Sequence, residues 1–237
     1  MKNEELTKLK EYLDKAANFE LPTYDHLPTV PLYMEQVVSY VNSILEPLST
    51  SDKQKLTSFM VNNYVKAKII SEPNKKKYNV DHLGYLLAIS LLKNVVNMND
   101  LSILIDMDKD VTSDKAVLYR FFKSMSADIF KDVAGKAKTR VDRFEENYQK
   151  EKTEDQEKAE QYFDDSIGLI AFRMSIQASV YQSVSQALFR YLEECKKSEE
   201  VDKKTKKKEE SEEKHKQKKA EKEAKKANKK EKRSEKQ

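Results

Sequence analysis

Residues 57–78 read Thr57-Ser-Phe-Met-Val-Asn-Asn-Tyr-Val-Lys-Ala-Lys-Ile-Ile70, followed by Ser71-Glu-Pro-Asn-Lys-Lys-Lys-Tyr78. The first part has the apolar spacing of a helix that also carries amide side chains, and we expect this helix over residues 54–69. Pro73 and Asn74 interrupt the second part, which predicts a loop; we call residues 71–78 the lysine loop. This layout can place a polar helix in a DNA groove and a basic loop on the adjacent phosphates.

The residues after the lysine loop predict a helix that lies inside a domain. Asn79 is a good capping residue, and the stretch to about Asn94 carries leucine and isoleucine nearly all round its circumference. A short helix that begins between Asn97 and Asp100 and carries more leucine and isoleucine is expected next.

Composition points to an all-α protein. Of 237 residues, only 3 are Gly and 5 are Pro, while 36% are charged, a balance that favours helices over a turn-rich sheet. The length allows one or two domains with a real core. We expect four regions: a lead-in (1–30), a DNA-binding domain (31–108), a helical region (109–195) and a tail (196–237).

The N-terminal part predicts two helices separated by a proline-rich segment. Residues 2–17 have helical spacing of leucine, and three prolines punctuate 21–31. Pro31 is expected to open a helix that runs to about Leu45. The polar run 49–52 is expected to cap the helix over 54–69.

Charge is unevenly distributed. The formal net charge is +4, but residues 196–237 carry +8, so residues 1–195 carry −4. No aromatic or large aliphatic residue follows Val201, and we expect the tail to be disordered or at most a transient solvated helix. It could add nonspecific nucleic-acid affinity or simply keep the chain in solution.

Cysteine usage and hydropathy bear on location. Cys195 is the one cysteine, so no intramolecular disulfide can form, and a cytoplasmic, reducing environment fits best. The charged first 20 residues lack the apolar core of a signal peptide. The most apolar long stretch, 167–192, contains arginines and glutamines, so we expect no membrane span.

A heptad pattern marks the region after the charged connection at 149–160. Its positions alternate by 4 and 3 residues, which is the spacing of a coiled-coil seam. We expect homodimerisation along this seam, with Gln177 fixing the register; the alternative is an intrachain helical bundle. A second apolar stripe, from Leu169 to Val180, widens the surface, so one stripe can pack within the chain and the other on a second subunit. The dimerisation residues expected on the seam are Phe163, Ile167, Ile170, Met174, Gln177, Tyr181, Val184 and Leu188.

The polar side chains around the lysine loop have the chemistry of DNA contacts. Amides can bond an adenine edge twice, hydroxyls can bond bases or phosphates, and lysines can meet phosphates without precise geometry. Residues 52–79 hold seven lysines against Asp52 and Glu72, a local charge of about +5 on an acidic body. The alternative is a solvated helix and a charged surface loop. The candidate contacts from residue chemistry are Thr57, Ser58, Asn62, Asn63, Lys66, Lys68, Lys75, Lys76 and Lys77.

Several segments together resemble a known DNA-binding domain. The runs 61–70, 76–83, 87–92 and 98–104 are similar to the winged helix-turn-helix of MerR-type regulators. The resemblance implies that Asn62, Asn63, Tyr64 and Lys66 lie on a recognition helix, with Lys76, Lys77 and Tyr78 in a wing. Lys68 stands where that family usually has glycine before an apolar pair, and Phe59 and Asn62 stand where phosphate-binding arginines are common.

Over about residues 20–190 the chain also resembles a bacterial family of unknown function. The element Leu21-Pro-Thr-Tyr-Asp-His-Leu-Pro28, followed later by Asn62-Asn-Tyr-Val-Lys66, carries this resemblance. Members of that family are expected to be MerR-like transcriptional regulators.

Together these observations predict a winged helix-turn-helix followed by a long-helix bundle. The expected function is a sequence-specific transcriptional regulator that binds double-stranded DNA as a dimer. The alternative is a non-enzymatic, all-helical protein-interaction or assembly factor. Enzymatic activity, a cofactor and a metal are not expected, since the three histidines are scattered and no phosphate-binding or nucleophile motif occurs. A third interpretation is a regulator whose 110–195 bundle holds a small-molecule effector among its aromatic side chains.

Overall fold

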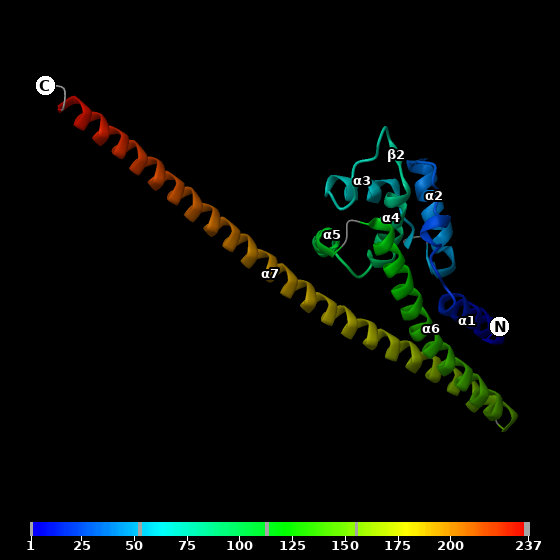
Figure 1. Cartoon of the computed structure of the whole chain (residues 1–237). Coiled ribbons are helices and arrows are strands. Elements are labelled where there is room, and N and C mark those ends of the chain that lie inside the picture. Colours follow the sequence, from blue (N-terminus) through cyan, green and yellow to red (C-terminus); the bar gives the residue numbers. More distant parts are fainter. Residues whose placement is uncertain (1, 52–53, 112–113, 155, 235–237) are drawn as a thin grey trace. The chain divides into compact units, whose positions relative to one another are not determined.

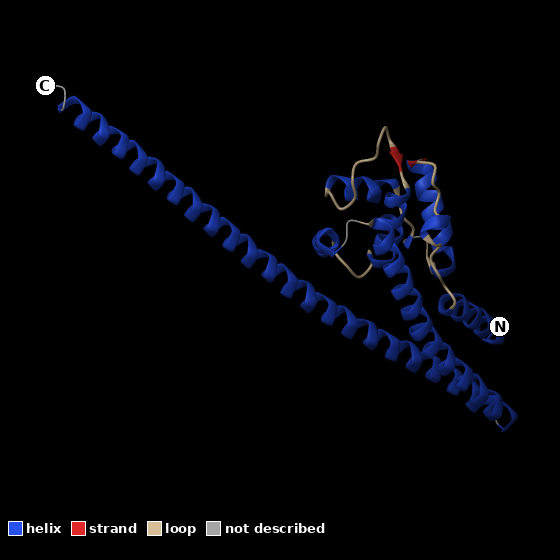
Figure 2. Cartoon of the chain, viewed as in Figure 1, coloured by secondary structure: helices blue, strands red, loops and turns tan. Residues whose placement is uncertain are grey.

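The computed structural model describes residues 2–51, 54–111, 114–154 and 156–234; for some helical residues, among them 106–111 and 206–234, only the backbone is described. The chain divides into two units, Met1–Val184 and Ser185–Gln237, which are taken separately here. The described residues are mostly helical, as predicted, with one short strand pair (Figure 2). The finer domain boundaries expected from the sequence stay predictions.

The first unit contains the elements of both the N-terminal part and the long-helix region (Figure 1). They follow one another as α1 (Lys2–Ala17), η1 (Tyr24–His26), β1 (Leu32–Tyr33), α2 (Met34–Leu45), η2 (Glu46–Leu48), α3 (Ser58–Lys66), β2 (Lys77–Tyr78), α4 (Val80–Leu92), α5 (Met98–Val111), α6 (Lys115–Glu154) and the start of α7 (Gln156–Ser234).

Two helix starts differ from the sequence-based prediction. Helix α2 begins at Met34 instead of Pro31, because Leu32 and Tyr33 form a strand that pairs antiparallel with Tyr78 and Lys77. Helix α3 begins at Ser58 instead of 54, because Thr57 is its cap: the Thr57 hydroxyl accepts a hydrogen bond from the Met60 amide at 3.3 Å. The predicted cap at Asn79 is confirmed, with Asn79 Oδ1 accepting from the His82 amide at 3.2 Å.

Helix α4 lies at the centre of the core. Its residues Leu83, Leu86 and Leu87 are fully buried, together with Val37 and Val41 of α2. The prediction that this helix lies inside the domain is therefore confirmed. Two further contributions come from Val61 of α3 and Leu21 of the proline-rich segment.

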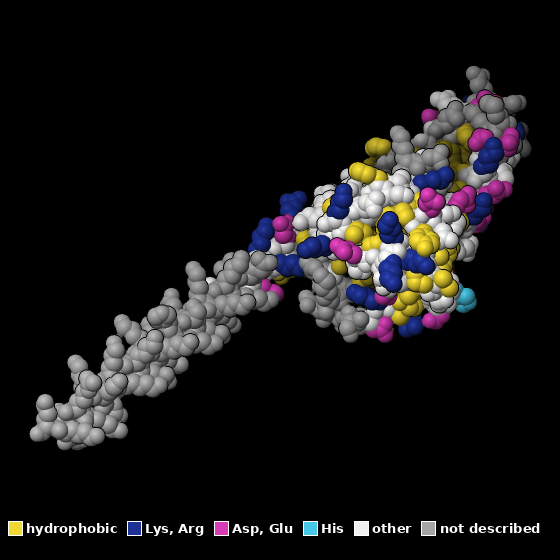
Figure 3. Space-filling view, turned by 90° about the horizontal axis from the view of Figure 1, so that it is seen from above, with side chains coloured by type: hydrophobic (Ala, Val, Ile, Leu, Met, Phe, Trp, Pro, Cys, Tyr) yellow, Lys and Arg dark blue, Asp and Glu magenta, His cyan; other side chains and the backbone are white. Residues whose placement is uncertain are grey.

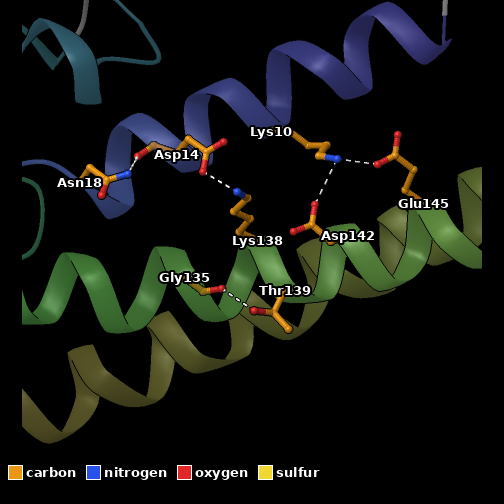
Figure 4. A network of polar contacts seen from close by, with 8 residues as sticks. All are labelled: Lys10, Asp14, Asn18, Gly135, Lys138, Thr139, Asp142 and Glu145. Atoms are coloured by element: carbon orange, nitrogen blue, oxygen red, sulfur yellow. Dashed lines mark hydrogen bonds and ion pairs between the residues drawn. The ribbon is translucent and has the colours of Figure 1, made fainter.

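Helix α6 is one continuous helix of 40 residues, and α1 lies along it (Figure 1). Lys10 of α1 pairs with Asp142 and Glu145 of α6 at 3.2 and 2.5 Å, and Lys138 of α6 pairs with Asp14 of α1 at 2.6 Å (Figure 4). These pairs are partly exposed to water, which screens their attraction, so they mainly fix the register of the two helices.

An apolar cluster holds the far end of α6. Leu6 of α1 and Val141, Phe144 and Tyr148 of α6 form it, and the first turns of α7 pack against them. The Phe163 ring meets the Phe144 ring edge-on, with centroids 5.1 Å apart. The charged connection expected at 149–160 is therefore the end of α6 and the start of α7.

Helix α7 continues to Ser234, through the segment that the sequence analysis expects to be disordered or a transient solvated helix. Residues 185–234 belong to the second unit. Because no large apolar residue follows Val201, the part of α7 after that residue cannot build a core of its own.

Gly84 of α4 and Gly135 of α6 allow a matched test of packing. A Cβ at Gly84 would lie 3.0 Å from the ring of Tyr119, whose hydroxyl is fixed by a 2.9 Å hydrogen bond to the Pro22 carbonyl. Nothing lies within 4 Å of a Cβ at Gly135. Alanine normally stabilises a helix interior by about 1 kcal/mol over glycine.

We therefore expect Gly135→Ala to raise the free energy of unfolding by about 0.5–1 kcal/mol, and Gly84→Ala to lower it by about 1 kcal/mol or more. Urea unfolding followed by circular dichroism measures both. Equal stabilisation by the two variants would show that Tyr119 does not hold its place against α4.

Candidate nucleic-acid interface

One face of α3 is exposed and polar. Val61 and Tyr64 point inward, whereas Ser58, Phe59 and Asn62 are exposed. At 3.6 residues per turn, the exposed positions 58, 59, 62 and 66 share one side of the helix. Lys66 therefore lies at the end of the same face as Asn62, and this face offers a hydroxyl, an amide, an aromatic ring and an ammonium group.

The chain leaves α3 through a left-handed residue. Lys68 has φ 58°, and the Ile69 amide bonds back to the Tyr64 carbonyl at 2.9 Å, which ends the helix and turns Ile69 and Ile70 into the core. Glycine is the usual residue for this conformation, because a Cβ costs about 1–2 kcal/mol there. Lys68 is exposed, so the backbone strain holds an ammonium group at the surface directly after α3.

The tip of the lysine loop is a tight turn with lysines at both central positions. The Lys77 amide bonds to the Asn74 carbonyl at 2.9 Å, and Lys75 and Lys76 have φ of 47° and 65°. Two positive φ values in succession are those of a type I′ turn, where Asn and Gly are usual. Among the described residues, the non-glycine positions with positive φ are Lys68, Lys75 and Lys76.

The strand pair ties the lysine loop to the start of α2. Leu32 lies opposite Tyr78, and Tyr33 lies opposite Lys77, whose ammonium group is 5.0 Å from the centroid of the Tyr33 ring. A cation over an aromatic face is attracted by the ring's electron density, which restricts where the Lys77 side chain points.

His82 anchors the other side of the lysine loop. The Asn79 amide donates to His82 Nδ1 at 3.1 Å, Nδ1 also contacts the Asn79 side-chain oxygen, and His82 Nε2 lies 3.2 Å from the Ser71 carbonyl. The Tyr78 ring packs edge-on against it at 5.3 Å. Burial lowers the pKa of His82, and the Ser71 carbonyl and Asp81 oppose this shift.

Most of the predicted contact residues reach the surface. Eight are exposed and Asn63 is half-buried, but Tyr64 and Tyr78 retain only 5% and 3% exposure. Burial also raises the pKa of both phenols. These two tyrosines are core residues and do not belong to the contact surface. The eight exposed ones are Thr57, Ser58, Asn62, Lys66, Lys68, Lys75, Lys76 and Lys77.

Sequence reasoning missed two exposed aromatic side chains on this side of the protein. Phe59 is 74% exposed, and Tyr33 is also exposed. The helical spacing could have revealed Phe59, which lies three residues before Asn62 on the same face. No sequence signal could have revealed Tyr33, because its place depends on the pairing of β1 with β2.

Lysines dominate the charge of the described residues 54–79, where six lysines stand against Glu72. Figure 3 views the protein from above Figure 1, and Lys and Arg side chains lie on this face beside exposed hydrophobic ones. We refer to Ser58, Phe59, Asn62, Lys66, Lys68 and Lys75–Lys77 together as the lysine face.

The predicted dimerisation seam is used partly within the chain. Phe163, Ile167 and Ile170 are half-buried against the cluster around Phe144. This part of the seam therefore packs within the chain, as the intrachain-bundle alternative expected. Met174 and Gln177 are half-buried as well. Tyr181 and Val184 are exposed, as is Leu188 in the second unit.

Comparison with known proteins gives a family for part of the chain. Residues 22–125 match the family model of a domain of unknown function (DUF1836), so the expected relation to a family of unknown function is supported over that range. No curated protein and no solved structure matches the chain.

No helix of the described residues has a stretch apolar enough, over sufficient length, to cross a membrane. No group of three or more His, Cys, Asp or Glu in the described part of the chain could hold a metal ion.

Lys68→Gly is expected to raise the free energy of unfolding by about 1 kcal/mol, because glycine adopts a positive φ without a Cβ clash. Lys68→Ala removes the same charge but keeps the Cβ, so it should leave stability nearly unchanged. Urea unfolding distinguishes the two. Equal stabilisation by both variants would place the effect in the charge instead of the backbone.

Protonation of His82 should destabilise the fold. Because burial lowers its folded pKa, the unfolded chain takes up the proton first as the pH falls below the ordinary value of 6.5. The contribution of His82 to the free energy of unfolding is therefore fully present above pH 6.5. It decreases as the pH falls below that value, by at most about 1.4 kcal/mol per pH unit. Chemical unfolding between pH 7.5 and 5.5 should show this loss, reduced in His82→Gln. The same slope in both proteins would contradict it.

Proposed function

We propose that the lysine face binds double-stranded DNA and that the protein is a sequence-specific transcriptional regulator. In this proposal α2 and α3 form a helix-turn-helix, α3 enters the major groove, and the lysine loop acts as the wing on the neighbouring phosphates. Asn62 and Ser58 face base edges, where an amide can make two hydrogen bonds to adenine.

The observation that carries the proposal is the placement of Lys68, Lys75 and Lys76 on left-handed backbone. Glycine or asparagine would take these conformations at lower cost. Lysine at all three positions gives up that stability and places three charged side chains on exposed turns that follow α3 in the chain. Cations near an exposed amide-bearing helix suit a ligand that combines regular phosphates with readable edges.

The position of Lys68 also supports the resemblance to MerR-type readers. Those domains usually have glycine between the recognition helix and the apolar pair, and the backbone at Lys68 has the conformation that glycine favours. The lysine face carries five lysines, whereas residues 1–195 as a whole carry a net charge of −4, so within that part of the chain phosphate attraction is strongest at this face.

A second candidate function is a protein-interaction or assembly factor that uses the same face. The exposed Phe59 and Tyr33 favour it, because aromatic side chains are enriched at protein interfaces. The two functions differ in what purified protein retains from fragmented genomic DNA. A discrete sequence supports the regulator, whereas bulk DNA that modest salt removes supports the interaction factor.

Replacing Lys75, Lys76 and Lys77 by Ala is expected to weaken binding to a DNA fragment enriched in that way by at least 10-fold at physiological salt. The slope of log affinity against log salt should become shallower by about 2–3, since each lost phosphate contact contributes about 0.9. Mobility shift over a salt series measures both quantities.

The matched control is Lys15→Ala with Lys131→Ala and Lys150→Ala, which removes the same charge from α1 and α6. It should leave the salt slope nearly unchanged. If the two triple variants lose affinity equally, the protein's overall charge and not the lysine loop sets the affinity, and the wing assignment fails.

A further inference from the structure

An apolar groove lies on the first unit between α4, α5 and α6. It encloses about 630 Å³ and is lined mostly by apolar side chains. Gly84 and Ala88, one turn apart on α4, line it on that side. Leu101 and Leu104 of α5 and Phe122 of α6 form the other walls.

The α6 wall of the groove continues as an exposed apolar stripe beyond it. Phe121 is 66% exposed, and four more large apolar side chains follow the same spacing of four residues. Single exposed apolar side chains are normal on a protein surface, but five in succession, each about 40° further round α6 than the last, mark a contact surface. We call this row the α6 stripe: Val117, Phe121, Met125, Ile129 and Val133.

A second apolar row is exposed on α7 within the first unit. We call it the α7 ridge: Leu169, Phe172, Ile176 and Val180, of which Phe172 is 65% exposed. Arg173 is the one charged residue between 166 and 184, in a chain that is 36% charged. A water-facing helix surface would carry far more charge than this.

The serines beside the ridge do not oppose burial. The Ser175 hydroxyl donates to the Ala171 carbonyl at 2.9 Å, and the Ser183 hydroxyl donates to the Ser179 carbonyl at 2.9 Å. Because these hydroxyls already have partners within the helix, covering them leaves no unsatisfied donor. Their small size also allows another helix to approach closely.

The ridge cannot face α6 of its own chain while the start of α7 keeps its packing. Phe163, Ile167 and Ile170 pack against the α6 cluster. At 3.6 residues per turn, the ridge is turned by roughly 120° from that seam. The ridge therefore needs a partner outside the chain that carries it.

We propose that this partner is a second copy of the chain, with the α7 ridge of each copy seated on the groove and α6 stripe of the other. The α6 stripe spans about 24 Å and the α7 ridge about 17 Å, so the ridge can lie along most of the stripe. The exchange is reciprocal, so a two-fold axis closes it and leaves neither surface open. The inference rests on the proposed function in one respect: a regulator that binds a two-fold symmetric DNA site needs two copies of its DNA-binding domain.

The buried area favours a stable dimer over a small ligand. The nine side chains of stripe and ridge expose on the order of 1,000 Å² per copy, against roughly 800 Å² per partner in a standard interface. A small molecule in the groove would leave Ile129 and Val133 uncovered, whereas a helix packed on α6 also contacts the stripe outside the groove.

Cross-linking of mixed chains tests the arrangement. One chain carries Phe121→Cys and the other Ile176→Cys, both with Cys195→Ser, and a short bismaleimide joins them. We expect a covalent heterodimer of 121 with 176 between chains. In the mixture, cross-links that join only position 121 to 121, or only position 176 to 176, would overturn the proposal. A separate sample of one chain that carries both cysteines tests the packing within a chain. A cross-link inside that single chain would also overturn the proposal. Glu11→Cys on α1, mixed with Ile176→Cys, should give no product.

Solution mass gives the second test. The full chain of 27.7 kDa should behave as a dimer at micromolar concentration, and Phe172→Asp with Ile176→Asp should weaken dimerisation at least 100-fold. The control, Ala171→Asp with Gln182→Asp, adds the same charge to another face of α7 and should remain dimeric. Circular dichroism shows that each variant stays helical. A monomeric wild type, or equal loss in both variants, would overturn the proposal.

The two proposals fail separately. A chain that stays monomeric and still enriches a discrete DNA sequence overturns the dimer and leaves the regulator in place. A dimer with the 121–176 cross-link that retains no DNA sequence overturns the regulator and leaves the interface in place.

Discussion

Burial of one face of α4 is the constraint on which the first unit depends. Leu83, Leu86 and Leu87 stand at i, i+3 and i+4 on that face and are all fully buried, so it forms the centre of the core. Helix α2 supplies Val37 and Val41 to this core. The short strand pair and the cap at Asn79 then set where the chain enters α4, and the lysine loop is held between these two anchors.

The lysine face follows from that arrangement. The inward turn of Ile69 and Ile70 after α3 requires a left-handed residue, and the tight turn before β2 requires two more. At each of these places the chain has lysine, so the same backbone features that close the core present cations to solvent. His82 links the two ends of the lysine loop, since its ring bonds the Ser71 carbonyl and the Asn79 amide at once.

The long helices extend the chain beyond that core. Ion pairs and the cluster around Phe144 use one face of α6 and the seam of α7, which leaves a second apolar face on each helix. Helical periodicity separates the two faces of α7 by roughly a third of a turn, so no single partner helix can cover both. The proposed dimer would cover these second apolar faces between two copies of the chain.

The sequence by itself determined the helical class, the central place of α4 and the cap at Asn79, because apolar periodicity and capping chemistry are local properties. It also placed most of the exposed lysine-face residues. Only the tertiary structure decided that Leu32 and Tyr33 form a strand, that Tyr64 and Tyr78 are buried, and which α7 stripe packs within the chain. These depend on contacts between segments far apart in the sequence, and a tyrosine at a helix end or strand has the same local pattern whether it faces the core or the solvent.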